Sequence, residues 1–413
     1  MAELFKAVTV DDAREMLARH LNVCGVKKQV SITETLGRRI AADVSAPEDV
    51  PGFDRSTMDG FAVLARDTFG ASEGLPAYLD VEGEIFMGRE VAGPIALGRI
   101  WRIPTGGMLP SGADAVVMVE HTEELDDRTI GVTRPVAPGE NIVRRGEDVA
   151  AGGMVLSNGQ IIRPQDMGLL AAVGVHTLEV EEPFRVTIIS TGDEVVAPDQ
   201  TPGPGQVRDI NSYALYGLTR QCGASPVLAG VVRDDFTALK EAMEKAIASS
   251  EMVLLSGGSS VGTRDVSLQV IESMGEPGVL FHGISIKPGK PTIGAVLGGK
   301  PVFGLPGHPV SAMVVFALLV EPLLRVGRYP SSDVERRLEF PLRARINRNI
   351  RSAAGRDDYI RITLKELAGE LIAEPVLGKS GLISTMVKAG GLAHIPTGME
   401  GVEAGEYVWV KPF

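Results

Sequence analysis

The sequence contains few cysteines, few aromatic residues and no long hydrophobic run. Only Cys24 and Cys222 are cysteines among its 413 residues, and two cysteines cannot build a disulfide framework or a cysteine-rich zinc site. The longest apolar stretch, residues 312–320, is much shorter than the roughly 20 residues that a membrane-spanning helix needs. The first ten residues, MAELFKAVTV, lack the basic and apolar segments of a secretory signal. We therefore expect a soluble, cytoplasmic protein with no membrane partner.

Basic residues are also in deficit. Lys and Arg number 41 against 53 for Asp and Glu, which gives a formal net charge of −12. A chain this acidic lacks the basic surface with which proteins hold nucleic acids, so we expect no nucleic-acid partner. Apolar residues make up 44% of the chain, enough to fill several hydrophobic cores, which excludes disorder as the main state.

The length predicts two to four domains, at roughly 100–200 residues per domain. Residues 9–21 have apolar side chains at helical spacing and begin with the Thr9 and Asp12 pattern of a capping box. Residues 51–145 are rich in glycine and proline and alternate short apolar runs with turns, which predicts a small β-rich domain. A helical pattern returns near residues 165–173. We therefore predict a discontinuous N-terminal domain, residues 1–50 and 146–182, with a β-rich insert domain at residues 51–145.

The next part of the chain, residues 183–329, alternates buried strands with helices. We expect strands at residues 185–190, 226–232, 252–255, 279–286 and 301–304. Helices are expected at residues 211–221, at 236–248 with Asp235 as N-cap, and in an apolar, buried segment after Pro309. This alternation predicts an α/β domain with a parallel sheet and helices on both faces.

The last part, residues 330–413, alternates apolar and polar residues with period two. Leu338, Phe340, Leu342, Ala344 and Ile346 would share one face of a strand, and residues 360–364 show the same pattern. A small β-barrel or sandwich is the structure that this pattern favours. The whole chain is thus predicted to be a multidomain protein of the α/β plus β class.

Three loops, each following a predicted strand, carry the strongest functional signal. Their sequences are STGDE at residues 190–194, SGGSSVG at 256–262 leading to Asp265, and LPGHP at 305–309. The carboxyl ends of parallel strands meet at one edge of a sheet, where ligands bind in such folds. Glycines allow close approach of the main chain, and Lys287 and Lys290 in KPGKP add positive charge for an anion. The candidate ligand-binding residues are Gly192, Asp193, Ser256, Gly257, Gly258, Ser259, Lys290, Pro306, Gly307, His308 and Pro309.

Carboxylates stand beside these cationic and amide groups. Asp193, Glu194 and Asp265 would repel a phosphate unless a divalent cation lay between them, and Mg²⁺ binds carboxylate and phosphate oxygens together. Any one of the loops could be an ordinary turn, since glycine, serine and aspartate are usual turn residues. The three loops together with KPGKP favour a site for a metal-bridged phosphoanhydride.

Seven motifs in a fixed order give the chain a specific resemblance. They are PGFDRSTMDGFAV, TGGMLPSGADAVV, RRGEDV, STGDE, SGGSSVGTRD, IKPGKP and LPGHPVSA. In this order they resemble the molybdopterin molybdenumtransferase family, which comprises the bacterial MoeA proteins and the C-terminal part of gephyrin. The resemblance implies a central molybdopterin-binding-type α/β domain and an enzyme of molybdenum cofactor biosynthesis. Such a transferase takes adenylylated molybdopterin and molybdate as substrates, uses Mg²⁺, and releases AMP as the metal is inserted.

The resemblance also implies a homodimer whose active cleft is shared between subunits, with the N-terminal domain in dimerisation. Asp59, Thr105 and Asp148 would then act from one subunit, and Glu194, Asp234, Asp265, Lys287, Pro306 and Pro309 from the α/β domain of the other, with Ser380 from the last domain. Glu194 and Asp265 would hold or orient Mg²⁺. A molybdopterin adenylyltransferase-type enzyme would supply the substrate. This chain has His308 where many family members have asparagine, and Gly283 where many have a second lysine.

Two other functions fit parts of the pattern. A scaffold could bind molybdopterin or a partner protein without catalysis, but the acids and lysines of the loops disfavour it. A stand-alone nucleotide hydrolase could share the α/β domain, but the MDG segment and the β-rich insert speak against it. Incubation with adenylylated molybdopterin, Mg²⁺ and molybdate distinguishes the scaffold from the transferase, because binding without AMP production supports the scaffold. Activity toward simple nucleotides tests for the hydrolase.

Overall fold

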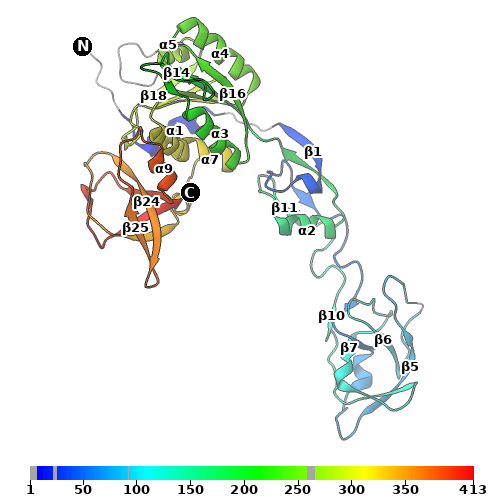
Figure 1. Cartoon of the computed structure of the whole chain (residues 1–413). Helices are drawn as coiled ribbons and strands as arrows, with labels where there is room; N and C mark the ends of the chain where they lie inside the picture. Colours follow the sequence, from blue (N-terminus) through cyan, green and yellow to red (C-terminus); the bar gives the residue numbers. More distant parts are fainter. Residues whose placement is uncertain (1–6, 22–25, 92, 258–265) are drawn as a thin grey trace. The chain divides into compact units, whose positions relative to one another are not determined.

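The structure, a computed structural model, describes residues 7–21, 26–91, 93–257 and 266–413. The chain forms two compact units (Figure 1). One unit is Val26–Glu182, and the other is Pro183–Phe413 together with the described N-terminal residues 7–21. The division into four domains stays a prediction.

A six-stranded sheet forms the centre of the larger unit. Its order is β16-β13-β17-β21-β20-β18, and the first four strands are parallel. The last two run antiparallel to their neighbours, so the predicted parallel sheet has an antiparallel edge that was not expected. Gly298 and Gly299 both have positive φ, 57° and 80°, and form the tight turn that joins β20 to β21 as a hairpin. The strands are β13 (Arg185–Thr191), β16 (Ser225–Val232), β17 (Met252–Ser256), β18 (Pro277–His282), β20 (Ile293–Leu297) and β21 (Lys300–Leu305).

The segment predicted as one strand at residues 279–286 is in fact two elements. Gly283, at a φ of +114°, ends the extended run after β18, and a short strand β19 (Ile286–Lys287) follows. Strand β20, which comes directly after KPGKP, was not predicted. The other predicted strands of this domain are confirmed within two residues at either end.

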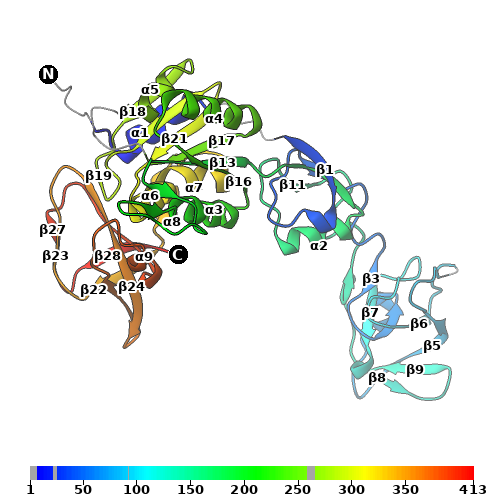
Figure 2. The same cartoon turned by 45° about the horizontal axis from the view of Figure 1, so that its top comes forward.

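Helices cover both faces of this sheet (Figure 2). Alternate residues of the buried strands face opposite sides, so that Ile188 and Leu254 pack in one core and Ile189 and Val253 in the other. The predicted capping box of Thr9 and Asp12 and the Asp235 cap are both present. The first core receives α1 (Val10–Ala18), α3 (Asn211–Gln221), α6 (Pro309–Val315) and α7 (Glu321–Val326), and the second receives α4 (Phe236–Ser249) and α5 (Val266–Glu272).

Helix α1 thus packs against the α/β sheet, although residues 1–50 were grouped by sequence with the N-terminal domain. Val10, Ala13 and Leu17 of this helix belong to the same core as Ile188 and Phe303.

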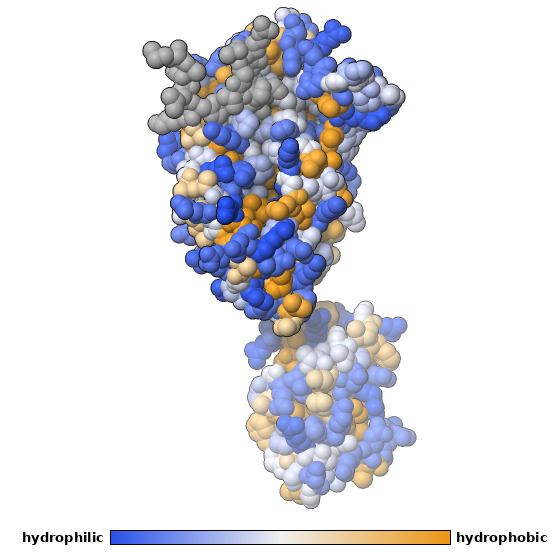
Figure 3. Space-filling view, turned by 60° about the vertical axis from the view of Figure 1, so that its left-hand side comes forward, coloured by the Kyte–Doolittle hydropathy of each residue, from blue (hydrophilic) through white to orange (hydrophobic). Residues whose placement is uncertain are grey.

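One continuous helical stretch is long and apolar enough to cross a membrane. It runs over Pro309–Val326 and consists of α6, the π-helical turn η4 (Phe316–Val320) and α7. Within the fold 78% of this stretch is buried, which is typical of the core helix of a soluble protein. The face of the molecule in Figure 3 is mostly hydrophilic, with apolar side chains in small patches.

The predicted C-terminal β-barrel is confirmed. Strands β24, β25, β22, β28 and β26 pair in that order, and β26 pairs again with β24 to close the ring. Strand β19 adds to β24 in parallel register, which attaches the KPGKP segment to the barrel. The barrel region contains β22 (Leu342–Ile346), β23 (Ile350–Arg351), β24 (Asp357–Leu367), β25 (Glu370–Pro375), α9 (Ser384–Lys388), β26 (Gly391–Ile395), β27 (Gly401–Val402) and β28 (Tyr407–Pro412).

The expectation that residues 338–346 form one strand was wrong. Ser332 accepts a hydrogen bond from the N–H of Glu335 and caps a short helix, α8 (Asp333–Glu339). Pro341 follows, and the strand β22 begins only at Leu342. Leu338 and Phe340 therefore lie outside the strand.

The smaller unit consists mainly of short strands, as predicted for residues 51–145. Its largest sheet has the order β7-β4-β6-β5-β9-β8, and three two-stranded ladders pair β1 with β12, β2 with β11 and β3 with β10. The helix predicted at residues 165–173 is α2 (Pro164–Ala172). The strands are β1 (Lys27–Ser31), β2 (Val44–Ser45), β3 (Arg55–Ser56), β4 (Gly60–Val63), β5 (Ala77–Glu84), β6 (Arg99–Ile103), β7 (Ala115–Met118), β8 (Thr122–Glu124), β9 (Thr129–Val132), β10 (Ile142–Val143), β11 (Met154–Leu156) and β12 (Thr177–Glu181).

Candidate active site

The three candidate loops begin at the ends of three adjacent parallel strands. The register aligns Ser190 of β13 with Ser256 of β17, and Ser256 with Leu305 of β21. The prediction that these strand ends share one edge of the sheet is confirmed. Gly257 has a φ of +107°, and a Cβ atom there would lie 2.1 Å from the carbonyl oxygen of Thr191. Only glycine allows the first two loops to approach this closely.

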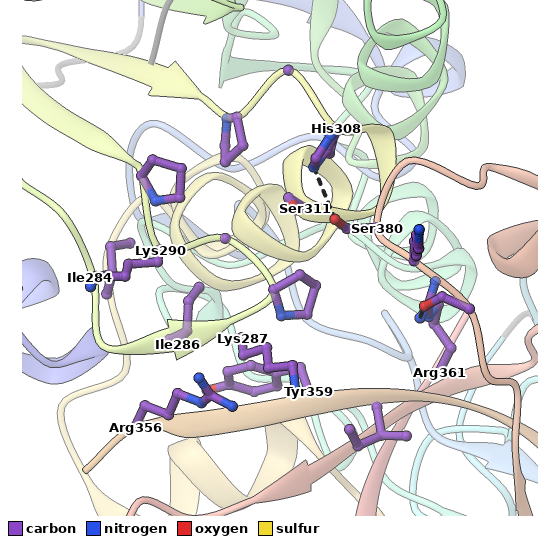
Figure 4. A pocket seen from close by; sticks show the side chains of 18 of the residues that line it. Ile284, Ile286, Lys287, Lys290, His308, Ser311, Arg356, Tyr359, Arg361 and Ser380 are labelled. Atoms are coloured by element: carbon purple, nitrogen blue, oxygen red, sulfur yellow. Dashed lines mark hydrogen bonds between the residues drawn. The ribbon is translucent and has the colours of Figure 1, made fainter. Parts of the chain in front are cut away.

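A pocket of about 1530 Å³ lies in the larger unit, between these strand ends and the barrel. Its walls come from the loops after β13, β17 and β21, from the segment Lys287–Pro291, and from residues 348–351, 353–356, 359–361 and 376–380 of the barrel (Figure 4). Ten of the sequence-predicted site residues line it: Gly192, Glu194, Asp234, Gly257, Lys287, Lys290, Pro306, Gly307, His308 and Ser380.

Two carboxylates lie at the strand-end side of the pocket. Glu194 and Asp234 both line it and are exposed. The hydroxyl of Thr191 donates a hydrogen bond to Asp234, which positions this carboxylate at the end of β13. The carbonyl oxygen of Glu194 accepts from the N–H of Val207 at 2.8 Å, beside the ladder of β14 (Val195–Val196) with β15 (Val207–Arg208). Asp193 accepts the N–H of Asp234 at 3.4 Å and does not line the pocket.

Positive charge dominates the rest of the wall. The described lining residues include seven Lys and Arg side chains but only two carboxylates, in a chain of net charge −12. Sequence analysis found Lys287 and Lys290 but missed the five cations from the barrel, which are Arg348, Arg351, Arg356, Arg361 and Lys379. A signal was present, because arginine recurs at 343, 345, 348, 351, 356 and 361 in an otherwise acidic chain.

Three of these arginines are held by the barrel itself, among them Arg348, which donates to the carbonyl oxygen of Pro375 at 2.7 Å. Arg361 donates to the carbonyl oxygen of Gly378 at 2.6 Å and to the hydroxyl of Thr385. Burial lowers the pKa of Arg361, but a guanidinium stays protonated at neutral pH. Arg356 donates through Nε to Asp358 at 2.9 Å. Tyr359, also in the wall, stays neutral because burial raises its pKa.

His308 connects the α/β domain with the barrel across the pocket. Its Nδ1 is hydrogen bonded to the hydroxyl of Ser380 at 2.9 Å (Figure 4). The carbonyl oxygen of Ser380 accepts the N–H of Val310 at 3.2 Å, at the start of α6. Two predicted residues, Ser380 and His308, are thus direct partners, whereas Pro309 is buried as the first residue of α6 and lies outside the pocket lining.

Asn211 is a site residue that sequence reasoning missed. Its side-chain Nδ2 donates to the hydroxyl of Ser256 at 2.7 Å and to the carbonyl oxygen of Gly307 at 2.9 Å. Asn211 is buried at the start of α3 and ties the loop after β17 to the loop after β21. Ser256 is buried in this contact rather than lining the pocket. The sequence placed Asn211 only as the first residue of a predicted helix, without a role in the site.

The smaller unit brings together two further predicted residues. Both the N–H of Thr105, at 2.7 Å, and its hydroxyl, at 2.9 Å, donate to one oxygen of Asp59. These hydrogen bonds, the backbone one first, hold the pKa of Asp59 below its usual value. Asp148 is exposed, and its N–H donates to the carbonyl oxygen of Val50. Three predicted residues, Gly258, Ser259 and Asp265, lie outside the described residues.

The fold and the pocket define a multidomain α/β protein with a pocket lined by cationic side chains at the carboxyl edge of its sheet. Three family models match consecutive parts of the chain. The MoeA N-terminal region (domains I and II) matches residues 8–174, a probable molybdopterin binding domain matches 187–326, and the MoeA C-terminal region (domain IV) matches 343–413.

Relatives of similar length match the whole chain. It is 37% identical to a putative molybdopterin biosynthesis protein of Methanocaldococcus jannaschii, over 95% of this chain and 94% of the relative. It is 33% identical to molybdopterin molybdenumtransferase 2 of Mycobacterium tuberculosis, over 97% of this chain and 98% of the relative. The crystal structure of a MoeA protein from Pyrococcus horikoshii matches with a TM-score of 0.82 and 37% identity, covering 98% of this chain and 99% of that one. The chain therefore belongs to the MoeA family of molybdopterin molybdenumtransferases.

Proposed function

We propose that this chain inserts molybdate into adenylylated molybdopterin, cleaves the adenylate with the help of Mg²⁺, and releases AMP. Its family makes it a transferase of molybdenum cofactor biosynthesis. The observation that carries the finer proposal is the pocket itself. Seven cationic side chains and two carboxylates among the described residues surround one cavity at the edge of the sheet, and this mixture suits a polyanionic substrate that is bridged by a cation.

The barrel side of the pocket suits a tetrahedral oxyanion. Lys287 and the guanidinium of Arg361 supply positive charge, and the hydrogen-bonded pair Ser380 and His308 supplies polar groups beside them (Figure 4). Arg361 is held in place by Gly378 and Thr385 before any ligand binds, so little side-chain entropy is lost on binding. We place molybdate here, as a substrate.

The strand-end side suits Mg²⁺ and the phosphoanhydride. Magnesium binds one or two carboxylates and completes its shell with water and phosphate oxygens. Glu194 and Asp234 line the pocket with exposed carboxylates and fit this requirement. Asp265, predicted from its motif, would complete the set. Within the described ranges no three His, Cys, Asp or Glu side chains lie close enough together to enclose a metal ion. The ion would therefore share its ligands with the substrate, where it would offset phosphate charge.

The chain's own groups then perform three tasks. Lys287, Lys290 and the barrel arginines offset the charge of phosphate and molybdate as the anhydride is cleaved. The glycines of the strand-end loops let main-chain N–H groups approach phosphate oxygens. Asp59 and Asp148 are carboxylates and poor partners for an anion, so we assign them to N–H groups of the ligand or to a cation.

We further propose that the protein is a cytoplasmic homodimer with a cleft shared between subunits. In support, β16 lies at the edge of its sheet, and Val227, Leu228 and Val231 on it are 42%, 38% and 38% exposed. Tyr213 and Tyr216 of α3 are exposed as well. An apolar sheet edge of this kind is usually covered by a partner. Sedimentation should give a dimer, and a stable monomer would contradict this part of the proposal. The substrate would come from an adenylyltransferase-type enzyme.

The substitution Glu194→Gln tests the catalytic proposal. We expect AMP release from adenylylated molybdopterin, with Mg²⁺ and molybdate present, to fall at least about 100-fold, the scale seen when one charge-stabilising group is removed. Asp193→Asn is the matched control, because Asp193 is the preceding carboxylate and lies outside the pocket lining. Its AMP release should stay within about threefold of the wild type. Full activity of the Glu194 variant would refute the assignment, and substrate binding without AMP release by the wild type would support a scaffold.

A further inference from the structure

A buried carboxylate lies directly behind the pocket wall. Asp358 of β24 is 0% exposed, and its Oδ1 accepts a hydrogen bond from Nε of Arg356 at 2.9 Å. Its second oxygen, Oδ2, is buried and has no hydrogen-bond partner within the described residues. Arg356 is thus the partner that compensates this charge, and Arg356 is also one of the cations that line the pocket.

The hydrogen bond uses the inner nitrogen of the guanidinium. Because Nε is occupied, the two terminal amino groups are left for another partner, and none is present for them among the described residues. Two parallel N–H groups of a guanidinium match the oxygens of a carboxylate, phosphate or similar oxyanion. The Arg356 side chain is 36% exposed and lies in the wall near Lys287 and Tyr359 (Figure 4).

The same strand pairing connects Asp358 with the other cation of this wall. In the parallel ladder of β19 with β24, Lys287 is opposite Asp358. The buried carboxylate therefore lies next to the strand that carries Lys287, at the junction of the α/β domain and the barrel.

Stability alone does not explain this ion pair, in which the carboxylate is buried and the guanidinium is partly exposed. The desolvation of the buried carboxylate offsets much of the attraction between the two charges, and apolar residues of similar size often replace such a pair without loss of stability. A carboxylate with one unpaired oxygen contributes still less to stability, because a buried acceptor without a partner keeps its desolvation penalty. Orientation of the guanidinium is a role that an apolar residue could not perform.

We infer that Asp358 is a positioning residue, which holds Arg356 through Nε so that the terminal amino groups of the guanidinium bind a tetrahedral oxyanion in the pocket. This inference rests on the proposed function, in which the pocket binds molybdate and a phosphoanhydride. It adds Asp358 to the residues on which the site depends, although Asp358 does not itself contact the ligand.

The test is the binding of molybdate and of inorganic pyrophosphate, each titrated alone and followed by calorimetry. Asp358→Asn keeps the shape of the side chain but removes the charge that orients Arg356. We expect it to weaken the binding of at least one of the two anions about fivefold to tenfold. Asp357→Asn is the matched control, because the neighbouring Asp357 accepts from His394 and Thr397, each at 3.0 Å, and does not line the pocket. The control should stay within about twofold of the wild type for both anions.

A double-mutant cycle separates positioning from a structural effect. If Asp358 acts through Arg356, Asp358→Asn should cause no further loss of affinity in an Arg356→Ala background. The melting temperature Tm should respond to these substitutions differently from the anion affinity. Arg356→Ala leaves Asp358 buried without its partner and should lower Tm, and adding Asp358→Asn should recover part of Tm without recovering affinity. Arg356→Lys, which keeps a charge but lacks the two-pronged group, should weaken binding as much as Asp358→Asn and covers the case in which the alanine variant does not fold.

Two results would overturn the inference. One is that Asp358→Asn leaves the affinity for both anions within twofold of the wild type, and the other is that it causes the same loss with and without Arg356. Failure of the wild type to bind either anion would also count against it. AMP release by the wild type is measured separately, so a failure of the catalytic proposal can be told apart from a failure of this inference.

Discussion

Thr105 controls the charge of Asp59 through two hydrogen bonds to one carboxylate oxygen. Both stabilise the ionised form, so the pKa of Asp59 lies below its ordinary value of 3.8. The favourable contribution of this ionised group to folding is present above the pKa of the unfolded state. It is lost as the pH falls through the lower pKa of the folded state. At any pH at which an enzyme of this kind works, Asp59 is therefore an acceptor only, which suits N–H groups of a ligand.

The substitution Thr105→Val removes the hydroxyl donor and keeps the backbone N–H. We expect the pKa of Asp59 to rise toward 3.8 without reaching it, because the backbone hydrogen bond is the larger of the two effects. Carbon-detected NMR titration of the Asp59 carboxyl measures the shift directly.

Thr122→Val is the control for this substitution. Thr122 donates its hydroxyl to the carbonyl oxygen of Val119 rather than to a carboxylate. It should leave the titration of Asp59 unchanged. An unchanged titration in the Thr105 variant as well would contradict the account of Asp59.

Individual site residues differed in how far the sequence could predict them. Glu194, Lys287 and His308 lie in short motifs next to predicted strands, so their chemistry and their place were both available. Arg361 and Arg356 reach the same pocket only because the barrel closes beside β19, a long-range pairing that no local pattern reports. Asn211 acts through a side chain buried between two loops, and such a contact is visible only in three dimensions.

At the scale of elements, the site depends on how closely the ends of β13 and β17 approach. Gly257→Ala would place a Cβ atom 2.1 Å from the carbonyl oxygen of Thr191, at a φ of +107° that alanine rarely adopts. We expect a loss of about 2 kcal/mol or more in the free energy of unfolding, together with loss of activity. Thermal or denaturant unfolding of the full chain measures the first effect.

Gly307→Ala is the matched control in the neighbouring loop. The nearest atom to its added Cβ would be the Cα of Gly257, at 4.0 Å, so there is space for the methyl group. Its free energy of unfolding should change by no more than about 0.5 kcal/mol. Equal stability of the two variants would show that the close approach of the loops is not a constraint on the fold.

Local signals predicted some elements well and others badly. Helices α3 and α4 were predicted within one residue because apolar spacing, Asp235 and Gly223 mark their limits. The antiparallel edge was missed because β20 is short and its direction depends on the Gly298–Gly299 turn. Leu338 and Phe340 continue the alternation of β22 and were predicted as part of the same strand, but the Ser332 cap starts a helix that ends at Glu339. Periodicity over few residues does not separate the two states.

For the whole molecule, the main feature is the contrast between an acidic chain and a cationic pocket. A net charge of −12 would repel molybdate and nucleotide alike, yet seven Lys and Arg side chains gather around one cavity. Composition excluded a general nucleic-acid binder but could not show this local reversal of sign. The reversal arises because the barrel presents its arginines to the pocket that Lys287 and Lys290 also line.

The position of bound molybdate tests this account most directly. A crystal of the full chain soaked in molybdate and measured at the molybdenum absorption edge gives an anomalous peak wherever the metal binds. We expect a peak inside the pocket, within hydrogen-bonding distance of Lys287 and of a guanidinium from Arg356 or Arg361. A pocket without such a peak at saturating molybdate, or peaks confined to other parts of the surface, would contradict the account.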